Sequence, residues 1–141
     1  MTTLPERLVL FCEALQSERE AALVRIGDTF TEDVHFRDPF RETVGLTALR
    51  ELFVRILRRY REVGFTGFRI DGDDASFTIT HDVHVRVAIG PVFVTAMASV
   101  CRAREGKIVD LLAYYDVPSA LASPFPGLAS AYRRATRALL L

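Results

Sequence analysis

Three polar side chains occupy positions from which they can act together on a small molecule: Asp38, His81 and Tyr115. A carboxylate beside an imidazole forms an acid/base pair, and a phenol can donate a hydrogen bond to a developing oxyanion. Residues around His81 alternate in character, so His81 shares one strand face with Ile79 and Val83. The same alternation turns Tyr115 inward on the last strand. We therefore predict that the three side chains open onto one apolar cavity.

Each of these side chains also has a purely structural interpretation. His81 can be a hydrogen-bonded core residue, and Tyr115 can be a cavity wall whose hydroxyl is satisfied. Asp38 precedes Pro39, and an aspartate there can cap the turn into Phe40. The sequence leaves both interpretations open for all three residues.

Metal and cofactor sites are not expected. His81 and His84 are three residues apart, as are His35 and Asp38, and residues at that spacing on a strand point to opposite faces. The sequence contains no G-x-S-x-G, P-loop or G-x-G-x-x-G motif. We therefore predict no metal ion, no nucleotide-phosphate site and no cofactor.

Helical periodicity dominates the first 60 residues. Thr3 and Glu6 form a capping box before the first apolar stripe, and a second helix is predicted over 18–30. A third helix follows Gly45 with Thr47 as its cap, and a last helix is predicted over about 128–140. The third helix has a charged outer face that indicates a solvated surface, formed by Arg50, Glu51, Arg55, Arg58, Arg59 and Arg61.

The middle of the chain changes to the pattern of strands. A short strand is predicted over 34–38, ended by Pro39. Four longer strands, separated by short turns, are predicted over 65–70, 76–89, 91–104 and 107–115. Short connections favour an antiparallel meander. The predicted fold class is α+β: a cone-shaped barrel with three N-terminal helices on a curved, mainly antiparallel sheet, plus a C-terminal helix.

A cone closed by one sheet and three helices leaves an apolar pocket. The residues predicted to line it are Phe11, Phe36, Phe53, Ile79, Val83, Ala98, Val100, Leu111 and Ala113.

Composition excludes several classes of protein. Half of the 141 residues are apolar, which excludes disorder, and 18 basic residues balance 18 acidic ones. A neutral chain is not a general nucleic-acid or anionic-membrane binder. Cys12 and Cys101 form no disulfide framework, and we expect both to be buried inert thiols. No leader or membrane-length apolar run is evident, so a cytoplasmic location is expected.

Two segments resemble the nuclear-transport-factor-2-like superfamily, which includes ketosteroid isomerases, limonene-type epoxide hydrolases and SnoaL-like polyketide cyclases. The first contains Phe36-Arg37-Asp38-Pro39-Phe40, Val44-Gly45 and a helix opening Thr47-Ala48-Leu49. The second contains Gly106-Lys107-Ile108-Val109 and Tyr114-Tyr115-Asp116. The resemblance implies one such domain over 4–117, with 118–141 as a C-terminal extension that carries the last helix.

The resemblance also implies a role for Asp38, which stands where ketosteroid isomerases place their general base. That isomerase is a worked example of an aspartate base assisted by two oxyanion donors, a tyrosine and a protonated aspartic acid. Here Phe11 replaces the tyrosine, and Ala98 or Ser99 replaces the acid. The arginine of epoxide hydrolases is replaced by Ala113, and 92–100 lacks the acid of the cyclases.

Two hypotheses for function remain. The first is a proton-transfer isomerase or cyclase that acts without a cofactor on an apolar carbonyl compound, with Asp38 as general base. The second is a non-catalytic binding or dimerisation module with an apolar pocket. The resemblance implies a homodimer formed through the open sheet face. The basic C-terminal helix is expected to pack on its own barrel or across a dimer, with contact to a membrane surface or another partner as the alternative.

Overall fold

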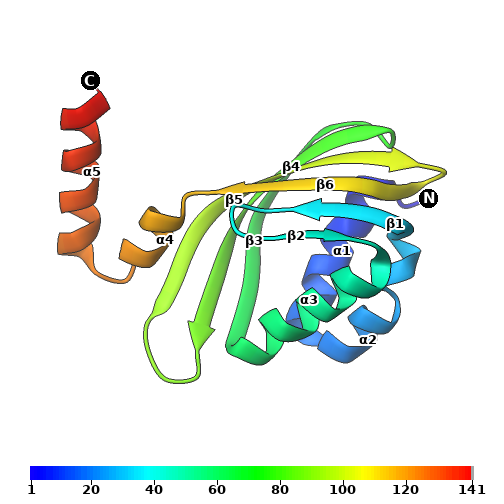
Figure 1. Cartoon of the computed structure of the whole chain (residues 1–141), viewed down its shortest axis with the longest axis horizontal. Helices are drawn as coiled ribbons and strands as arrows, with labels where there is room; N and C mark the ends of the chain where they lie inside the picture. Colours follow the sequence, from blue (N-terminus) through cyan, green and yellow to red (C-terminus); the bar gives the residue numbers. More distant parts are fainter. Residues whose placement is uncertain (141) are drawn as a thin grey trace.

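The computed structural model describes residues 1–140 as a curved six-stranded sheet with helices against one face (Figure 1). The helices are α1 (Leu4–Ser17), α2 (Arg19–Val24), η1 (a 3-10 turn, Ile26–Asp28), α3 (Leu46–Arg59), α4 (Val117–Ala122) and α5 (Pro126–Leu140). The strands are β1 (Phe30–Arg37), β2 (Glu42–Val44), β3 (Tyr60–Gly72), β4 (Ser76–Val87), β5 (Val92–Arg104) and β6 (Lys107–Tyr115). The predicted α+β fold class is confirmed.

The sheet has the order β2-β1-β6-β5-β4-β3. The strands β3 to β6 form the predicted antiparallel meander. The strand β1 pairs in parallel with β6, along the edge of β6 opposite β5. The three-residue strand β2, which pairs with β1 after a tight turn, is not predicted from the sequence. Such a short strand carries too few residues for an alternation pattern.

The helix starts test the capping predictions. The Thr3 hydroxyl accepts a hydrogen bond from the Glu6 amide, and the Glu6 carboxylate accepts one from the Thr3 amide, so the predicted capping box is confirmed. Thr47 does not cap α3, which begins at Leu46 directly after Gly45. Gly45 has a φ of +97°, and this left-handed turn carries the chain from β2 into the helix without a side-chain cap.

The predicted helix over 18–30 is too long. Helical structure ends at Val24, a 3-10 turn follows, and Phe30 already begins β1, where it pairs with Ile108. The spacing of Leu23, Ile26 and Phe30 fits one face of a helix, and all three side chains are buried. Each of them lies in a different element, so a helical spacing of buried residues occurs here without a continuous helix.

The strand β3 contains a bulge. The pairing of β3 with β4 shifts register between Thr66 and Arg69, and Gly67 within that shift has a φ of +70°. A glycine in this conformation bends a strand away from a flat sheet. The bend lets β3 and β4 wrap around the helices at the lower part of Figure 1.

The C-terminal helix α5 stands apart from the sheet, at the left of Figure 1. It contacts α4, and the Tyr132 hydroxyl donates to the Asp116 carboxylate at 3.4 Å. None of its residues is buried, and Leu128 and Leu139 of its apolar stripe are exposed. The predicted packing of this helix on its own barrel is therefore wrong, and its packing across a dimer stays a prediction. Every helix within residues 1–140 is too short or too polar to cross a membrane.

Two glycines of β3 give a test of the curved hairpin. Both have positive φ, but a Cβ on Gly67 meets nothing within 4 Å, whereas one on Gly72 overlaps the Ser76 carbonyl oxygen and lies 2.7 Å from the Phe77 Cα. We expect Gly72→Ala to lower the free energy of unfolding by about 2 kcal/mol more than Gly67→Ala does. Urea denaturation of the two variants measures this difference. Equal losses would contradict the close approach of the two strands at Gly72.

Candidate functional site

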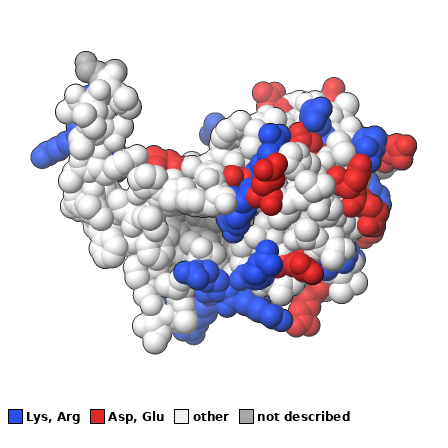
Figure 2. Space-filling view, in the orientation of Figure 1, with Lys and Arg blue, Asp and Glu red and all other residues white. Residues whose placement is uncertain are grey.

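The concave face of the sheet encloses a cavity of about 520 Å³, bordered by α1, α3, α4 and the inner faces of β3 to β6. This volume lies in the range of small-molecule sites. Most of the lining side chains are apolar, and Figure 2 shows a hollow in this region. The few polar side chains therefore decide what chemistry the cavity supports.

Aromatic rings close one end of the cavity. Phe11 packs edge-on against Phe30 and Phe53, with ring centroids 5.5 and 5.8 Å apart, and Phe36 packs against Phe53 at 6.2 Å. The resemblance described above matches Phe11 with the tyrosine of ketosteroid isomerases. The ring of Phe11 packs in this cluster, and a phenylalanine side chain cannot donate a hydrogen bond to a ligand.

Seven of the nine residues predicted to line the pocket do line it. They are Phe11, Phe36, Phe53, Ile79, Val83, Leu111 and Ala113.

The predictions for Ala98 and Val100 are wrong. The register pairs Ala98 with Thr80 and Val100 with Thr78, on the face of the sheet that points away from the cavity. The side chains of β5 that do line the cavity are those of Phe93, Thr95, Met97 and Ser99. An error of one residue reverses the face of every side chain on a strand.

His81 lies in the cavity with no polar partner. Its side chain is buried, 7% exposed, and neither ring nitrogen forms a hydrogen bond to any group of residues 1–140. The rings of Phe65 and Phe68 lie 5.7 and 5.1 Å from the imidazole. Burial lowers the pKa of His81, and the nearby Asp82 carboxylate opposes this only in part. The imidazole is therefore neutral at pH 7, with one nitrogen able to donate and the other able to accept.

Asp38 has both carboxylate oxygens occupied. Oδ1 accepts from the backbone amides of Phe40 and Arg41 at 2.9 and 2.8 Å, which closes the turn after β1. Oδ2 forms an ion pair with the Arg41 guanidinium at 2.7 Å, and the Asp38 side chain is only 3% exposed. The structure thus contains the turn cap that the sequence allowed for Asp38.

Tyr115 is joined to Asp38 through Arg41. The Arg41 guanidinium donates to the Tyr115 hydroxyl oxygen at 3.2 Å. Burial raises the pKa of Tyr115, so the phenol keeps its proton at neutral pH. Because its oxygen accepts from Arg41, its own O–H remains available to donate.

Asp38 and His81 do not pair with each other. Both line the cavity, together with Tyr115, but Asp38 binds Arg41 while His81 has no partner within residues 1–140. The three predicted site residues therefore belong to two separate groups in the cavity: an imidazole without a partner, and a linked carboxylate, guanidinium and phenol.

Several residues of the site are not predicted from the sequence. Arg41 belongs to no sequence motif, although an arginine three residues after an aspartate that caps a turn can return to its carboxylate. Arg59 was assigned to the solvated face of its helix, yet it lines the cavity. The extension beyond residue 117 contributes Ala120 and Leu121 to the wall, a tertiary contact that no local pattern predicts.

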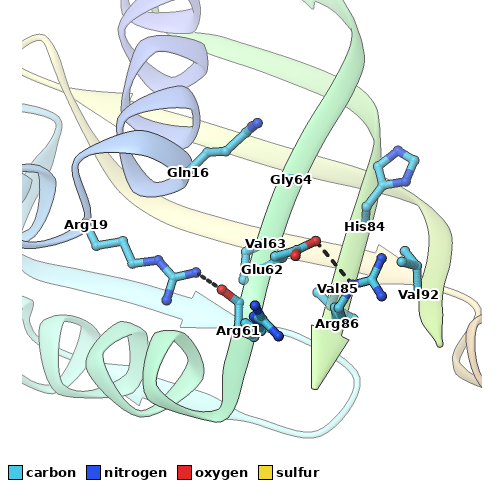
Figure 3. Close-up of a pocket in the computed structure, with 10 residues that line it drawn as sticks. All are labelled: Gln16, Arg19, Arg61, Glu62, Val63, Gly64, His84, Val85, Arg86 and Val92. Carbon is cyan, nitrogen blue, oxygen red and sulfur yellow. Dashed lines mark hydrogen bonds and ion pairs between the residues drawn. The ribbon is translucent and has the colours of Figure 1, made fainter. Parts of the chain in front are cut away.

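A second cleft, of about 280 Å³, lies between the end of α1 and the start of β3 (Figure 3). The Arg19 guanidinium donates to the carbonyls of Leu57, Tyr60 and Arg61, which end α3 and begin β3. Arg86 forms an ion pair with Glu62 at 3.2 Å. These polar groups are used within the fold, so the larger cavity is the better candidate site.

Both cysteines are poor nucleophiles. Cys12 and Cys101 are free thiols, and burial raises the pKa of each to about 12. His84 points away from His81 and bonds the Thr66 hydroxyl at 3.0 Å. Residues 1–140 contain no group of three side chains able to hold a metal ion.

Comparison with protein families gives one match. The model of the SnoaL-like domain matches residues 10–111, which is most of the chain. No curated protein matches the sequence.

Solved structures share the fold. A hypothetical protein with a ketosteroid isomerase-like fold from Catenulispora acidiphila, crystallised with trimethylamine, is 23% identical with a TM-score of 0.73, over 87% of this chain and 94% of that one. An LEH-like epoxide hydrolase from M. tuberculosis is 22% identical with a TM-score of 0.70, over 94% and 98%. A putative polyketide cyclase from Xanthomonas campestris is 18% identical with a TM-score of 0.71, over 84% and 95%. At these identities, the similarity shows a common fold.

The buried imidazole makes stability depend on pH. Because the pKa of His81 is lowered in the folded state, the unfolded chain binds a proton below about pH 6.5 that the folded chain excludes. We expect the free energy of unfolding to fall between about pH 7.5 and 5.5, and to fall less in His81→Leu.

Urea denaturation at both pH values measures this effect. His84→Gln is the control, because its imidazole lies on the opposite face and its loss leaves His81 in place. Parallel pH curves for the wild type and His81→Leu would show that His81 does not titrate as its burial predicts.

Proposed function

Since this chain belongs to the SnoaL-like domain family, we propose that it binds a small, mostly apolar molecule in the cavity, with one polar atom of that molecule hydrogen-bonded to His81. The observation that carries the proposal is the imidazole itself. A buried polar group without a partner costs free energy, about 1–3 kcal/mol, that a bound polar atom recovers. Both ring nitrogens of His81 are covered by surrounding atoms and have no hydrogen-bond partner within residues 1–140, and the residue lines the apolar cavity of about 520 Å³.

A fluorescent apolar probe tests this binding. N-phenyl-1-naphthylamine carries no charge and becomes fluorescent in an apolar environment. We expect it to bind the wild type and to bind at least about tenfold more weakly to Ala113→Phe, because the ring occupies the cavity. Ser99→Phe provides a second obstruction in case the first variant does not fold.

Ala98→Phe is the matched control. It adds the same ring to the neighbouring strand, on the face that points away from the cavity. We expect its affinity for the probe to equal that of the wild type. Failure of the wild type to bind, or equal loss in Ala98→Phe and Ala113→Phe, would refute binding in this cavity.

A second candidate function, proton transfer on a carbonyl compound, is favoured by the position of Tyr115. His81 and Tyr115 flank Met97 on the two strands adjacent to β5, so their backbones are about 10 Å apart on one face. A ketone whose oxygen accepts from the Tyr115 O–H then presents its neighbouring carbon toward His81. Similar structures named as a polyketide cyclase and an epoxide hydrolase support an enzymatic function of this kind.

The proton transfer would use the neutral imidazole as base. One nitrogen of His81 takes a proton from the carbon next to the carbonyl, and the C–H electron pair moves to the oxygen as an enolate. The Tyr115 O–H, held by Arg41, stabilises that oxygen. Asp38 fixes Arg41 by its ion pair and acts as a positioning residue in this arrangement. The imidazolium then returns the proton to carbon.

Deuterium exchange separates this arrangement from one with Asp38 as base. In D2O, the protons beside the carbonyl of 1-tetralone are followed by NMR. We expect His81→Gln to lower the enzyme-dependent exchange rate by about 100-fold or more, and Tyr115→Phe by about tenfold or more. Asp38→Asn, which keeps the oxygen that caps the turn, lowers it by less than about tenfold. Loss of exchange in Asp38→Asn with retention in His81→Gln would instead assign the base to Asp38.

The proposal also covers the oligomeric state of the protein and its location in the cell. We keep the predictions of a homodimer through the open sheet face and of a cytoplasmic location. Val100 and Tyr114 are exposed apolar side chains on the face of the sheet away from the cavity, which supports the dimer.

A further inference from the structure

We propose that the ligand of this cavity is an apolar carboxylic acid whose anionic group binds Arg59 at the rim, an inference that rests on the proposed binding function. Three charged side chains line the cavity: Asp38, Arg41 and Arg59. His81 is neutral, so the lining carries one more positive than negative charge at pH 7. A ligand with a single negative charge complements it.

Arg59 supplies the unbalanced charge. The Arg41 guanidinium is committed to the Asp38 carboxylate and to the Tyr115 hydroxyl. Arg59 forms no ion pair or side-chain hydrogen bond with any group in residues 1–140. Its five N–H donors are thus available for a carboxylate, which a guanidinium binds with two parallel hydrogen bonds.

The neighbouring Arg58 shows that the position of Arg59 needs a separate explanation. Both arginines occupy the last turn of α3, where a positive charge complements the helix dipole. Both are exposed, but only Arg59 lines the cavity. The helix dipole therefore explains why this turn contains arginines. It does not explain why the side chain of Arg59 lies at the cavity rim.

Arg59 lies at the junction of α3 and β3, directly before Tyr60, which also lines the cavity. The end of α3 and the Arg41–Tyr115 pair therefore border the same cavity. Figure 2 shows basic side chains near the margin of the hollow, with acidic side chains beside some of them.

The interior then receives the apolar body of the ligand. Tyr60 pairs with Val87 on β4, six residues from His81, which is about 20 Å along the strand. A ligand anchored at the rim extends inward along this face, past the apolar side chains of Val85 and Val83. The far end of the ligand then approaches His81. A ligand with a polar atom at that end can form a hydrogen bond with the imidazole.

A pair of probes that differ only in charge tests the anchor. 1-Anilinonaphthalene-8-sulfonate is N-phenyl-1-naphthylamine with an added sulfonate, and fluorescence titration measures the affinity of both. We expect the wild type to prefer the anionic probe. Arg59→Gln is expected to weaken the anionic probe about threefold to tenfold, with the neutral probe unchanged. Arg58→Gln is the matched control, expected to leave both affinities at the wild-type value.

The outcomes distinguish the binding of an anionic group by Arg59 from the binding of an apolar molecule in the cavity. Equal affinity of the anionic probe for the wild type and Arg59→Gln, with the neutral probe still bound, overturns the anchor and leaves apolar binding intact. Equal weakening by Arg58→Gln also overturns it, since general surface charge would then explain the effect. Retention of the anionic probe by Ala113→Phe places it outside the cavity and overturns the inference. Loss of both probes from the wild type refutes the proposed function itself.

Discussion

The cavity exists because the strands are much longer than the helices that cover them. The 13 residues of β3 or of β5 extend about 43 Å, whereas the 14 residues of α1 or of α3 extend about 21 Å. The N-terminal helices therefore bury only part of the concave face, and the cluster around Phe11 fills that part. Beyond it, the inner residues of β4 and β5 face a space that α4 borders on one side. A small-molecule cavity follows from the element lengths before any particular side chain is considered.

Within that space, the local turn after β1 determines which polar groups are free. Pro39 ends the strand, and Asp38 turns its carboxylate back to the amides of Phe40 and Arg41. The turn brings the Arg41 guanidinium onto the same carboxylate and within reach of Tyr115. The one carboxylate among the cavity-lining side chains is thereby paired with a cation, whereas both ring nitrogens of His81 have no partner among residues 1–140. A turn motif of four residues thus sets the electrostatics of the whole site.

The sequence predicted the fold well because its signals were local and repeated. The capping box at Thr3 and the alternation around His81 correctly located a helix start and a cavity face. Errors arose where one residue or one distant contact decided the outcome, as with Ala98, whose face depends on a register that a single residue reverses. Arg41 and Arg59 look like surface arginines in the sequence, because their place in the site depends on where a turn and a helix end in space. The roles of Asp38, His81 and Tyr115 depend on contacts, which spacing alone does not determine.

Cys101 is buried and Cys12 is half-buried in the cavity wall, and the raised pKa values of both thiols have a practical consequence for spectroscopy. With a pKa of about 12, only about one in 100,000 of either thiol is thiolate at pH 7, and maleimides and disulfide reagents react with the thiolate. A third cysteine placed on the exposed surface of α5 would therefore be the preferred site for a dye or spin label in an otherwise unaltered chain. Such a label reports how the isolated helix moves relative to the sheet, on timescales from rotamer exchange to domain motion.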